Sequence, residues 1–307
     1  MLNPERLNLL VQLQALKTMR AVADVSRLSV STVSQQIAAL ERDVGRPLIE
    51  RVGRQVRLTP LGNELVDRAR PVLNDLREIE DMACSESMEV RGAIRVAAFT
   101  SALAPLAAPA CAAMKTRFTN LTITLNELEP GRSLPLLDAG QLDIVFSASF
   151  ASRERKTGTA VSLGRMSLPL LSDRLCAVLP ESHPLAGERS VHIEDLADDI
   201  WLQEPEGTYL SNHIRTLTDQ AGFEPTMAGV ISSYPAVLQS VASDFGVAVL
   251  PWLATTANVN GISVVPIEPT VARSVSLVTT SSQLSRLAIR QFAETARELA
   301  EKLRIPE

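Results

Sequence analysis

Aromatic residues are scarce in this 307-residue chain, where Trp, Tyr and Phe together make up 4% of the sequence. The hydrophobic fraction is nevertheless 46%, so any core must be mainly aliphatic. No run of about eighteen apolar residues occurs, which predicts that no helix spans a membrane. The first twenty residues also lack a basic start, an apolar run and a small-residue cleavage site, so we expect no secretion signal.

Cysteine and histidine are equally rare, and each residue type occurs three times. The cysteines are too few and too far apart for a disulfide framework or a zinc site, which fits a reduced cytoplasm: Cys84, Cys111 and Cys176. The histidines are isolated from one another: His183, His192 and His213. The sequence contains no nucleophile elbow, phosphate loop or convincing acid pair. We therefore expect no metal, no cofactor and no enzymatic activity.

The net charge of −5 conceals an uneven distribution along the chain. Residues 1–60 hold 9 Lys or Arg and 5 Asp or Glu, which gives +4 and leaves −9 for the remainder. A basic N-terminal segment on an acidic body indicates that an anionic polymer is bound at one end only.

Residues 29–44 carry the strongest periodic pattern. Apolar side chains recur at steps of four, three and four, which predicts an amphipathic helix: Val33, Ile37, Leu40 and Val44. The opposite face is small and polar: Ser31, Ser34, Gln35, Ala38 and Arg42. Such a face can approach base edges in a major groove, and Gln can form two hydrogen bonds with adenine. The alternative is a core helix with an unremarkable outer face.

The flanking segments favour a winged helix-turn-helix over residues 1–60. Helices are expected over residues 5–17 and 19–26, and Ser29 is a suitable N-cap for the third helix, which ends near Gly45. A short β-prone hairpin with three arginines then forms the wing, although a basic surface loop is the alternative. The predicted DNA contacts are Ser29, Val30, Ser31, Thr32, Ser34, Gln35, Arg51, Arg54 and Arg57.

Residues 61–90 are expected to form a linker helix and a hinge. Thr59 can cap a helix that begins at Pro60 and bends at Pro71. Apolar residues then recur at alternating steps of four and three, as in a heptad seam that needs a partner helix. The alternative is packing against the helix's own domain. The predicted dimer contacts are Leu61, Leu65, Val72, Leu76 and Ile79.

Residues 91–307 alternate strands and helices, which predicts an α/β domain with parallel strands. The chain is expected to cross twice between two lobes, near 163–166 and 266–270. Lobe I would contain about 91–163 and 269–307, and lobe II about 164–268.

Ligand residues in this domain can be predicted only from their positions. Ligands of parallel α/β sheets lie beyond the carboxyl ends of strands, near helix N-termini. The hydroxyl and amide groups at such ends suit a small anionic or zwitterionic metabolite, although helix capping explains each of them equally well. They are Thr100, Ser101, Ser147, Ser149, Gln203, Thr208, Ser232 and Ser233.

The segment VSQQIAALERDVGRPLIERVGRQVRLTPLG, residues 33–62, resembles the signature of LysR-type transcriptional regulators. GQLDIVFSAS, LPESHPLAG, EDLADDIWL, AGFEP and FGVAVLP resemble motifs of the LysR effector domain, so the resemblance covers almost the whole chain. Departures from the usual family pattern occur at 17–20, 30–31 and 243–245.

This resemblance implies a two-lobed effector domain that is similar to periplasmic solute-binding proteins. It also implies an operator in double-stranded DNA, a homodimer that can pair into a homotetramer, and RNA polymerase as a further partner. Effector binding would close the lobes and move the DNA-binding heads. A solute-binding receptor and an enzyme on the same fold are the alternatives. The 29–62 segment and the lack of an export signal disfavour the receptor, and the lack of catalytic motifs disfavours the enzyme.

Overall fold

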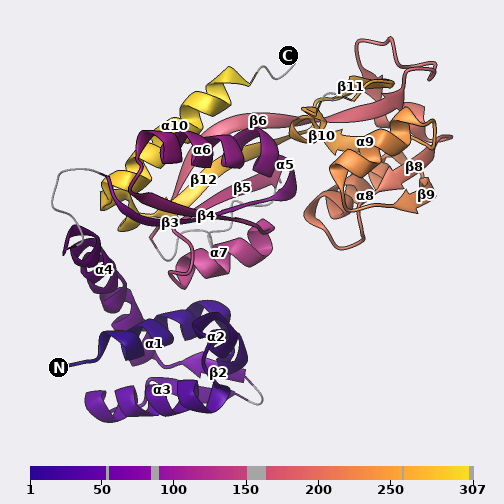
Figure 1. Ribbon diagram of the computed structural model, residues 1–307. Helices are drawn as coiled ribbons and strands as arrows, with labels where there is room; N and C mark the ends of the chain where they lie inside the picture. Colours follow the sequence, from indigo (N-terminus) through magenta and orange to yellow (C-terminus); the bar gives the residue numbers. More distant parts are fainter. Residues whose placement is uncertain (53–54, 84–89, 151–163, 258, 304–307) are drawn as a thin grey trace.

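The computed structural model describes the whole chain except residues 53–54, 84–89, 151–163, 258 and 304–307 (Figure 1). It contains an N-terminal domain, a long helix and a two-lobed α/β domain. Within the described residues, no helix is both long enough and apolar enough to cross a membrane. The predicted hinge at 84–92 lies mostly outside the described residues.

The N-terminal domain has three helices and a hairpin, as the sequence predicts. The helices are α1 (Pro4–Leu16), α2 (Met19–Ser26) and α3 (Val30–Val44), and the hairpin strands are β1 (Ile49–Val52) and β2 (Gln55–Leu58). The predicted inner face of α3 is buried, with Val33, Ile37 and Leu40 fully inaccessible to solvent. The helices begin at side-chain caps and end at left-handed residues, which satisfies their terminal backbone groups.

Helix α4 (Pro60–Ala83) begins where the sequence predicts it. Thr59 Oγ1 accepts a hydrogen bond from the backbone N–H of Gly62 at 3.0 Å. The helix continues through Pro71. Its buried residues Val66, Ala69 and Leu73 join the core of the N-terminal domain, so this face packs against its own domain.

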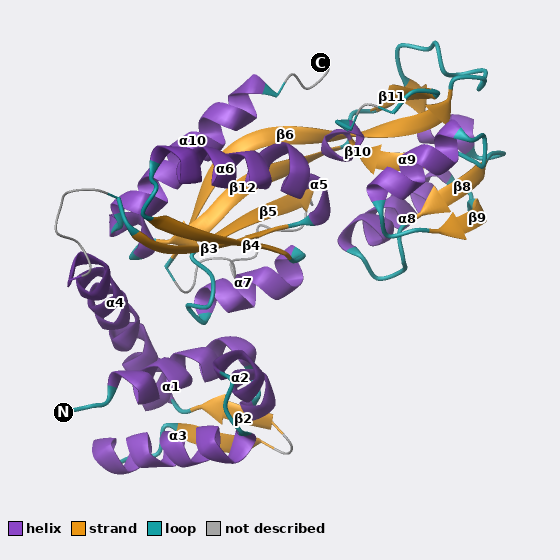
Figure 2. Cartoon of the chain, in the orientation of Figure 1, coloured by secondary structure: helices purple, strands orange, loops and turns teal. Residues whose placement is uncertain are grey.

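Lobe I is a mixed sheet between two layers of helices (Figure 2). Strands β3 (Gly92–Ala98), β4 (Leu121–Glu127) and β5 (Ile144–Phe150) are parallel, and β12 (Ala272–Thr280) is antiparallel to β5. One face is covered by α6 (Ala108–Arg117) and α10 (Leu287–Lys302), and α7 (Pro130–Asp138) covers the other. The helix expected after Phe99 consists of α5 (Thr100–Ala102), a π-helical turn (Leu103–Ala107) and α6. A 3₁₀ turn (Gln283–Ser285) precedes α10.

Lobe II has its own core, which surrounds the fully buried Trp201. Its strands are β7 (Val191–His192), β8 (Ile200–Gln203), β9 (Thr226–Val230), β10 (Ala248–Pro251) and β11 (Ile262–Glu268). Its helices are α8 (Tyr209–Ala221) and α9 (Tyr234–Ala242), with 3₁₀ turns at Ile193–Leu196 and Trp252–Thr255. The sequence pattern does not predict β11. The segment HIEDLAD, residues 192–198, has the pattern of a helix but forms a single 3₁₀ turn.

One long strand, β6 (Arg165–Pro180), belongs to both lobes. Its first part pairs with β12 up to Arg174, whereas Leu175–Pro180 pair with β10 and β11. The sheet therefore changes from lobe I to lobe II within β6, later than the expected boundary at 164. The return crossing from β11 to β12 falls within the expected region around 266–270.

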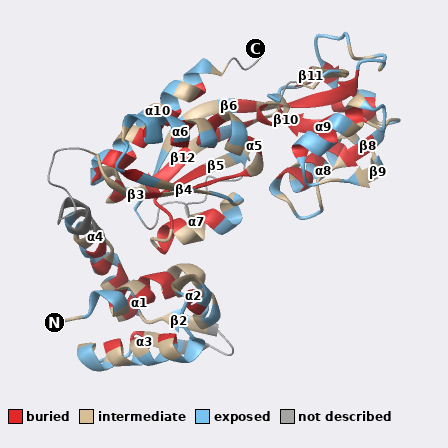
Figure 3. Cartoon of the chain, viewed as in Figure 1, coloured by how far each residue is buried: buried red, intermediate tan, exposed pale blue. Residues whose placement is uncertain are grey.

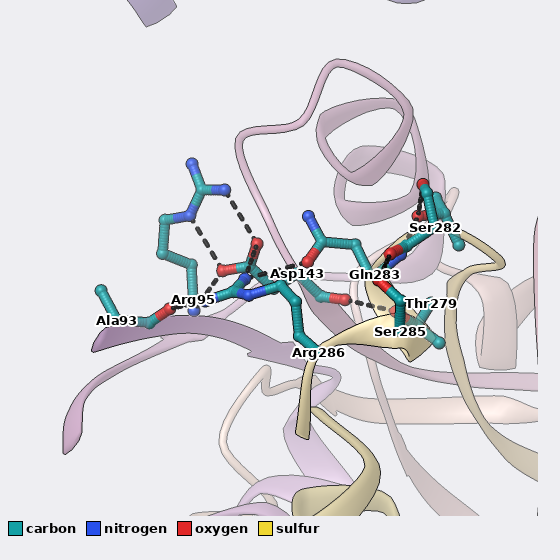
Figure 4. A network of polar contacts seen from close by, with 9 residues as sticks. Ala93, Arg95, Asp143, Thr279, Ser282, Gln283, Ser285 and Arg286 are labelled. Carbon is teal, nitrogen blue, oxygen red and sulfur yellow. Dashed lines mark hydrogen bonds and ion pairs between the residues drawn. The ribbon is translucent and has the colours of Figure 1, made fainter. Parts of the chain in front are cut away.

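A network of polar contacts joins several elements of lobe I around the buried Asp143 (Figure 4). Asp143 is 1% exposed and accepts hydrogen bonds from the guanidinium of Arg95 at 2.9 and 3.0 Å. Arg286 donates to Gln283 Oε1 and to the carbonyl of Ala93, both at 2.9 Å. These contacts join β3, the start of β5 and the start of α10.

Candidate DNA-binding and effector-binding sites

The predicted recognition surface is the outer face of α3. Ser31, Ser34, Gln35, Ala38 and Arg42 are all exposed there. Figure 3 shows this face at the edge of the molecule farthest from the effector domain. Nothing in the described chain covers it, so a DNA groove could reach these side chains.

Ser29 and Thr32 hold the start of α3 in place rather than standing free. Ser29 Oγ accepts a hydrogen bond from the backbone N–H of Thr32 at 3.0 Å and lies 2.7 Å from Ser31 Oγ. Val30 is 48% exposed at the first helical position. Arg27, which the sequence analysis did not select, lies exposed in the turn before this cap, in the left-handed conformation.

Glu41 fixes the wing relative to the recognition helix. Its Oε1 accepts hydrogen bonds from the backbone N–H groups of Leu48 and Ile49 at 2.8 and 3.1 Å. Arg57 is exposed on β2, opposite Glu50 of β1. The Arg51 side chain and all of Arg54 lie outside the described residues.

The predicted dimer residues divide between two surroundings. Leu61 and Leu65 pack partly against the core of their own domain, and Leu76 is partly buried. Val72 and Ile79 are 51% and 58% exposed and belong, with Leu65, to a row with a seven-residue spacing. The helix thus buries one stripe in its own domain and leaves a second stripe available to a partner helix.

The predicted effector residues approach one another only in part. Thr100 Oγ1 donates to Glu127 Oε1 at 2.7 Å and lies 3.5 Å from Glu129 Oε1. Thr208 caps α8 and donates to Glu204 Oε2 at 2.9 Å. Glu129 of lobe I lies close enough to Glu204 of lobe II for the charge of Glu204 to affect it, so Thr100 and Thr208 flank one acidic group.

The remaining candidates lie in different surroundings. Ser101 is 3% exposed, and its hydroxyl accepts a hydrogen bond from Arg273 Nη2. Ser147 and Ser149 pair with Ser276 and Ser274 of β12. Gln203 lies half-buried at the end of β8, whereas Ser232 and Ser233 are exposed before α9.

A buried ion pair lies on the lobe I side of the boundary between the lobes. Arg273 Nε donates to Asp173 Oδ2 at 2.9 Å, and Asp173 Oδ1 accepts from the backbone N–H of Leu253 at 3.0 Å. Burial raises the pKa of Asp173, although the charge of Arg273 acts in the opposite direction. Arg273 also lies close enough to Glu129 for its charge to oppose the rise in pKa that desolvation causes there.

Sequence reasoning missed the charged members of the lobe boundary. Glu129 is exposed, and partial desolvation together with the nearby charge of Glu204 raises its pKa. Tyr234 is 6% exposed, and burial together with Glu204 raises the pKa of its hydroxyl. Glu129 and Glu204 both follow strand ends, so the same positional rule could have found them if carboxylates had been considered beside hydroxyls and amides.

An aromatic stack also joins the two lobes. Phe150 at the end of β5 lies against His213 of α8, with ring centroids 3.6 Å apart, and against Tyr209 at 5.3 Å. Burial lowers the pKa of His213, which favours the neutral imidazole in this stack. Among the described residues, no cluster of His, Cys, Asp or Glu is arranged to hold a metal ion.

Comparison with known proteins identifies both domains. The family "Bacterial regulatory helix-turn-helix protein, lysR family" matches residues 4–63, and "LysR substrate binding domain" matches residues 87–301. OxyR of Escherichia coli (strain K12), a DNA-binding transcriptional dual regulator, is 27% identical over 299 residues, with 96% of this chain and 95% of OxyR covered. The transcriptional dual regulator GltC of Bacillus subtilis (strain 168) is 25% identical over 250 residues, and 81% of each chain is covered.

Solved structures have the same fold. A full-length OxyR variant from Pseudomonas aeruginosa gives a TM-score of 0.66 at 23% identity, with 97% of this chain and 95% of that chain covered. Full-length CbnR in complex with its target DNA gives a TM-score of 0.55 at 20% identity, with 97% and 99% covered. The chain belongs to the LysR family of bacterial transcriptional regulators and is a DNA-binding protein with an effector domain rather than an enzyme.

Proposed function

We propose that this LysR-family regulator reads its operator with the outer face of α3 and clamps the DNA backbone with the wing. The observation that carries this proposal is the exposed, nearly uncharged row on α3 beside a basic hairpin. The row would read base edges, and Arg51, Arg54 and Arg57 would contact phosphates. The regulator would act in the cytoplasm without a cofactor, and RNA polymerase would be a further partner.

A salt-dependent gel shift on footprinted genomic fragments tests this role. Binding should weaken steeply as salt rises, because phosphate contacts release counterions. Gln35→Ala should reduce the preference for the operator over unrelated DNA, whereas Arg57→Ala should weaken binding to both. Equal loss of operator and unrelated binding in Gln35→Ala would contradict base readout by α3.

We also propose that the effector binds at the lobe boundary around Thr100, Thr208 and Tyr234. Glu129 and Glu204 approach this place from opposite lobes, and the Arg273 charge is already paired with Asp173. A purely anionic ligand would face carboxylates there, whereas an ammonium group would relieve their repulsion. We therefore narrow the expected effector from an anionic or zwitterionic metabolite to a zwitterionic one.

A relative from Haemophilus influenzae, 27% identical over 281 residues, is named hydrogen peroxide-inducible genes activator, which raises the question of peroxide sensing. Peroxide oxidises exposed cysteines of low pKa, because the thiolate is the reactive form. Cys111 and Cys176 are buried, and burial raises the pKa of their thiols to about 11 and about 12. We propose that neither thiol senses peroxide in this protein; Cys84 lies outside the described residues.

A thermal-shift screen tests the proposed effector class. A ligand that binds only the folded protein raises Tm. Free amino acids should raise Tm more than dicarboxylates of similar size, and Glu204→Gln should reduce this preference. Glu188→Gln, an exposed change elsewhere in lobe II, is the matched control. A stronger response to dicarboxylates would contradict the zwitterion proposal.

A further inference from the structure

The DNA-binding domain of this chain rests on lobe I beside a cavity of about 830 Å³. Residues of α1, α4 and α7 line this cavity, together with the 280–283 turn. Figure 1 shows α7 between the lobe I sheet and α1. Because this cavity lies between the two domains, individual polar contacts beside it help to fix their orientation.

Arg70 of α4 makes one contact within its own domain and one contact across the boundary. Its Nη2 donates to Gln14 Oε1 of α1 at 2.7 Å, and its Nη1 donates to the backbone carbonyl of Asp138 at the end of α7. Gln14 in turn donates to Asn63 Oδ1 of α4 at 2.8 Å. A guanidinium suits this position, because the last carbonyls of a helix are unpaired and carry partial negative charge.

The side chain of Asp138 is held by a second arginine. Arg165 Nε donates to Asp138 Oδ1 at 2.7 Å, and Arg165 Nη2 pairs with Oδ2. Asp138 is 5% exposed, so this two-bond ion pair is shielded from solvent on the Asp138 side. Arg165 is the first residue of β6, the strand that continues into lobe II.

Asp138 therefore accepts hydrogen bonds from two arginines: Arg70 of α4 binds its backbone carbonyl, and Arg165 of β6 binds its carboxylate. We infer that Arg70 is a positioning residue, which sets the orientation of the DNA-binding head on lobe I. Through Asp138 and Arg165, the same contact links the head to β6. This role goes beyond the family's function and does not depend on the proposed effector site.

The same geometry indicates that the DNA-binding domain can move away from this position on lobe I. The buried Nε of Arg70 has no hydrogen-bond partner among the described residues, and an unpaired buried donor costs free energy. Interfaces between domains that are small and polar generally permit relative motion. A shift of β6 that displaces Arg165 would move Asp138 and thereby weaken the hold of Arg70.

Pulsed dipolar spectroscopy on the full chain tests this inference. Spin labels on unnatural amino acids replace Asp24 of α2 and Glu298 of α10, which are both exposed. Dilution with unlabelled protein limits the signal to labels within one subunit. Arg70→Met removes both donors but keeps an apolar stem, and Arg68→Met, an exposed change on the same helix, is the matched control.

The wild type and Arg68→Met should give the same narrow distance distribution. Arg70→Met should broaden it, and Arg70→Lys should restore it in part, because an ammonium can reach one acceptor but lacks the planar fork. Unchanged circular dichroism shows that Arg70→Met is folded. Arg165→Met should also broaden the distribution, by less than Arg70→Met.

Identical distributions for Arg70→Met and Arg68→Met would overturn the positioning role. Broadening in Arg70→Met with a wild-type distribution in Arg165→Met would overturn the link to β6. If Arg70→Met loses helical signal, the distance distribution of Arg70→Lys becomes the test. A wild-type distribution for Arg70→Lys would show that the contact of Arg70 with both acceptors does not set the orientation.

Discussion

Arg57 shows how one side chain can contribute affinity without sequence preference. It is exposed on β2, on the hairpin that Glu41 fixes beside α3. Arg57→Ala should weaken binding to all DNA sequences alike and lower the slope of log affinity against log salt by about one unit. Gel shifts at several salt concentrations measure this slope. Arg189→Ala, an exposed arginine in lobe II, should leave it unchanged.

Gly62 allows α4 to approach the segment before the wing. A Cβ at this position would lie 2.2 Å from the carbonyl oxygen of Leu48, a backbone atom that cannot rotate away. Gly62→Ala should therefore lower the free energy of unfolding by about 1–3 kcal/mol, as overpacked substitutions do. Urea unfolding followed by circular dichroism measures the change.

Gly131→Ala is the control for this overpacking effect. It places the same Cβ in the helix α7, where no heavy atom other than those of its chain neighbours and of the helix backbone lies within 4 Å. Alanine is also the better helix former, so the control should be neutral or slightly stabilising. Equal destabilisation by both substitutions would contradict the steric explanation.

At the scale of the element, helix α4 has one apolar stripe that is buried in its own domain and a second that is exposed. Val66, Ala69 and Leu73 pack in the N-terminal core, whereas Val72 and Ile79 remain exposed. Ile79→Asp would place a charge in the proposed dimer seam and should weaken the dimer by about 3 kcal/mol. Sedimentation at several concentrations measures the association.

Asp75→Asn provides the comparison for the seam, because Asp75 is exposed on the same helix. It should leave the dimer intact. An unaltered dimer of Ile79→Asp at micromolar concentration would show that α4 is not the main interface.

At the scale of the whole molecule, the two lobes bring glutamates of like charge together. Desolvation and the charge of Glu204 raise the pKa of Glu129. A carboxyl whose pKa is raised by folding favours the folded state below its unfolded pKa, and this stability is lost as pH rises through the folded pKa. Glu129→Gln should therefore raise Tm at neutral pH.

This gain should shrink as pH falls toward the ordinary carboxyl pKa of 4.5, because Glu129 of the wild type is then protonated. Thermal unfolding between neutral and acidic pH measures the trend. Glu188→Gln is exposed and should show no such gain. A Tm difference for Glu129→Gln that grows at acidic pH would contradict the desolvation and repulsion argument.

The sequence alone determined the elements whose signals are local. The caps at Ser29 and Thr59, the period of α3 and Gly45 after its end predict helix starts, faces and stops, because capping and amphipathicity act over a few residues. The alternation of strands and helices likewise predicted the α/β effector domain. The family resemblance, carried by residues 33–62, is confirmed by both domain matches.

Only the tertiary structure decided which residues meet across long separations. The position of Ser101 predicts a contact with the effector. Its hydroxyl instead accepts a hydrogen bond from Arg273, which lies 172 residues later in the chain. The sharing of β6 between the lobes, the approach of Glu129 to Glu204 and the contact of Arg70 with Asp138 have no local signature. Such contacts follow from how the sheets and domains pack, and the period or spacing of neighbouring residues does not specify that packing.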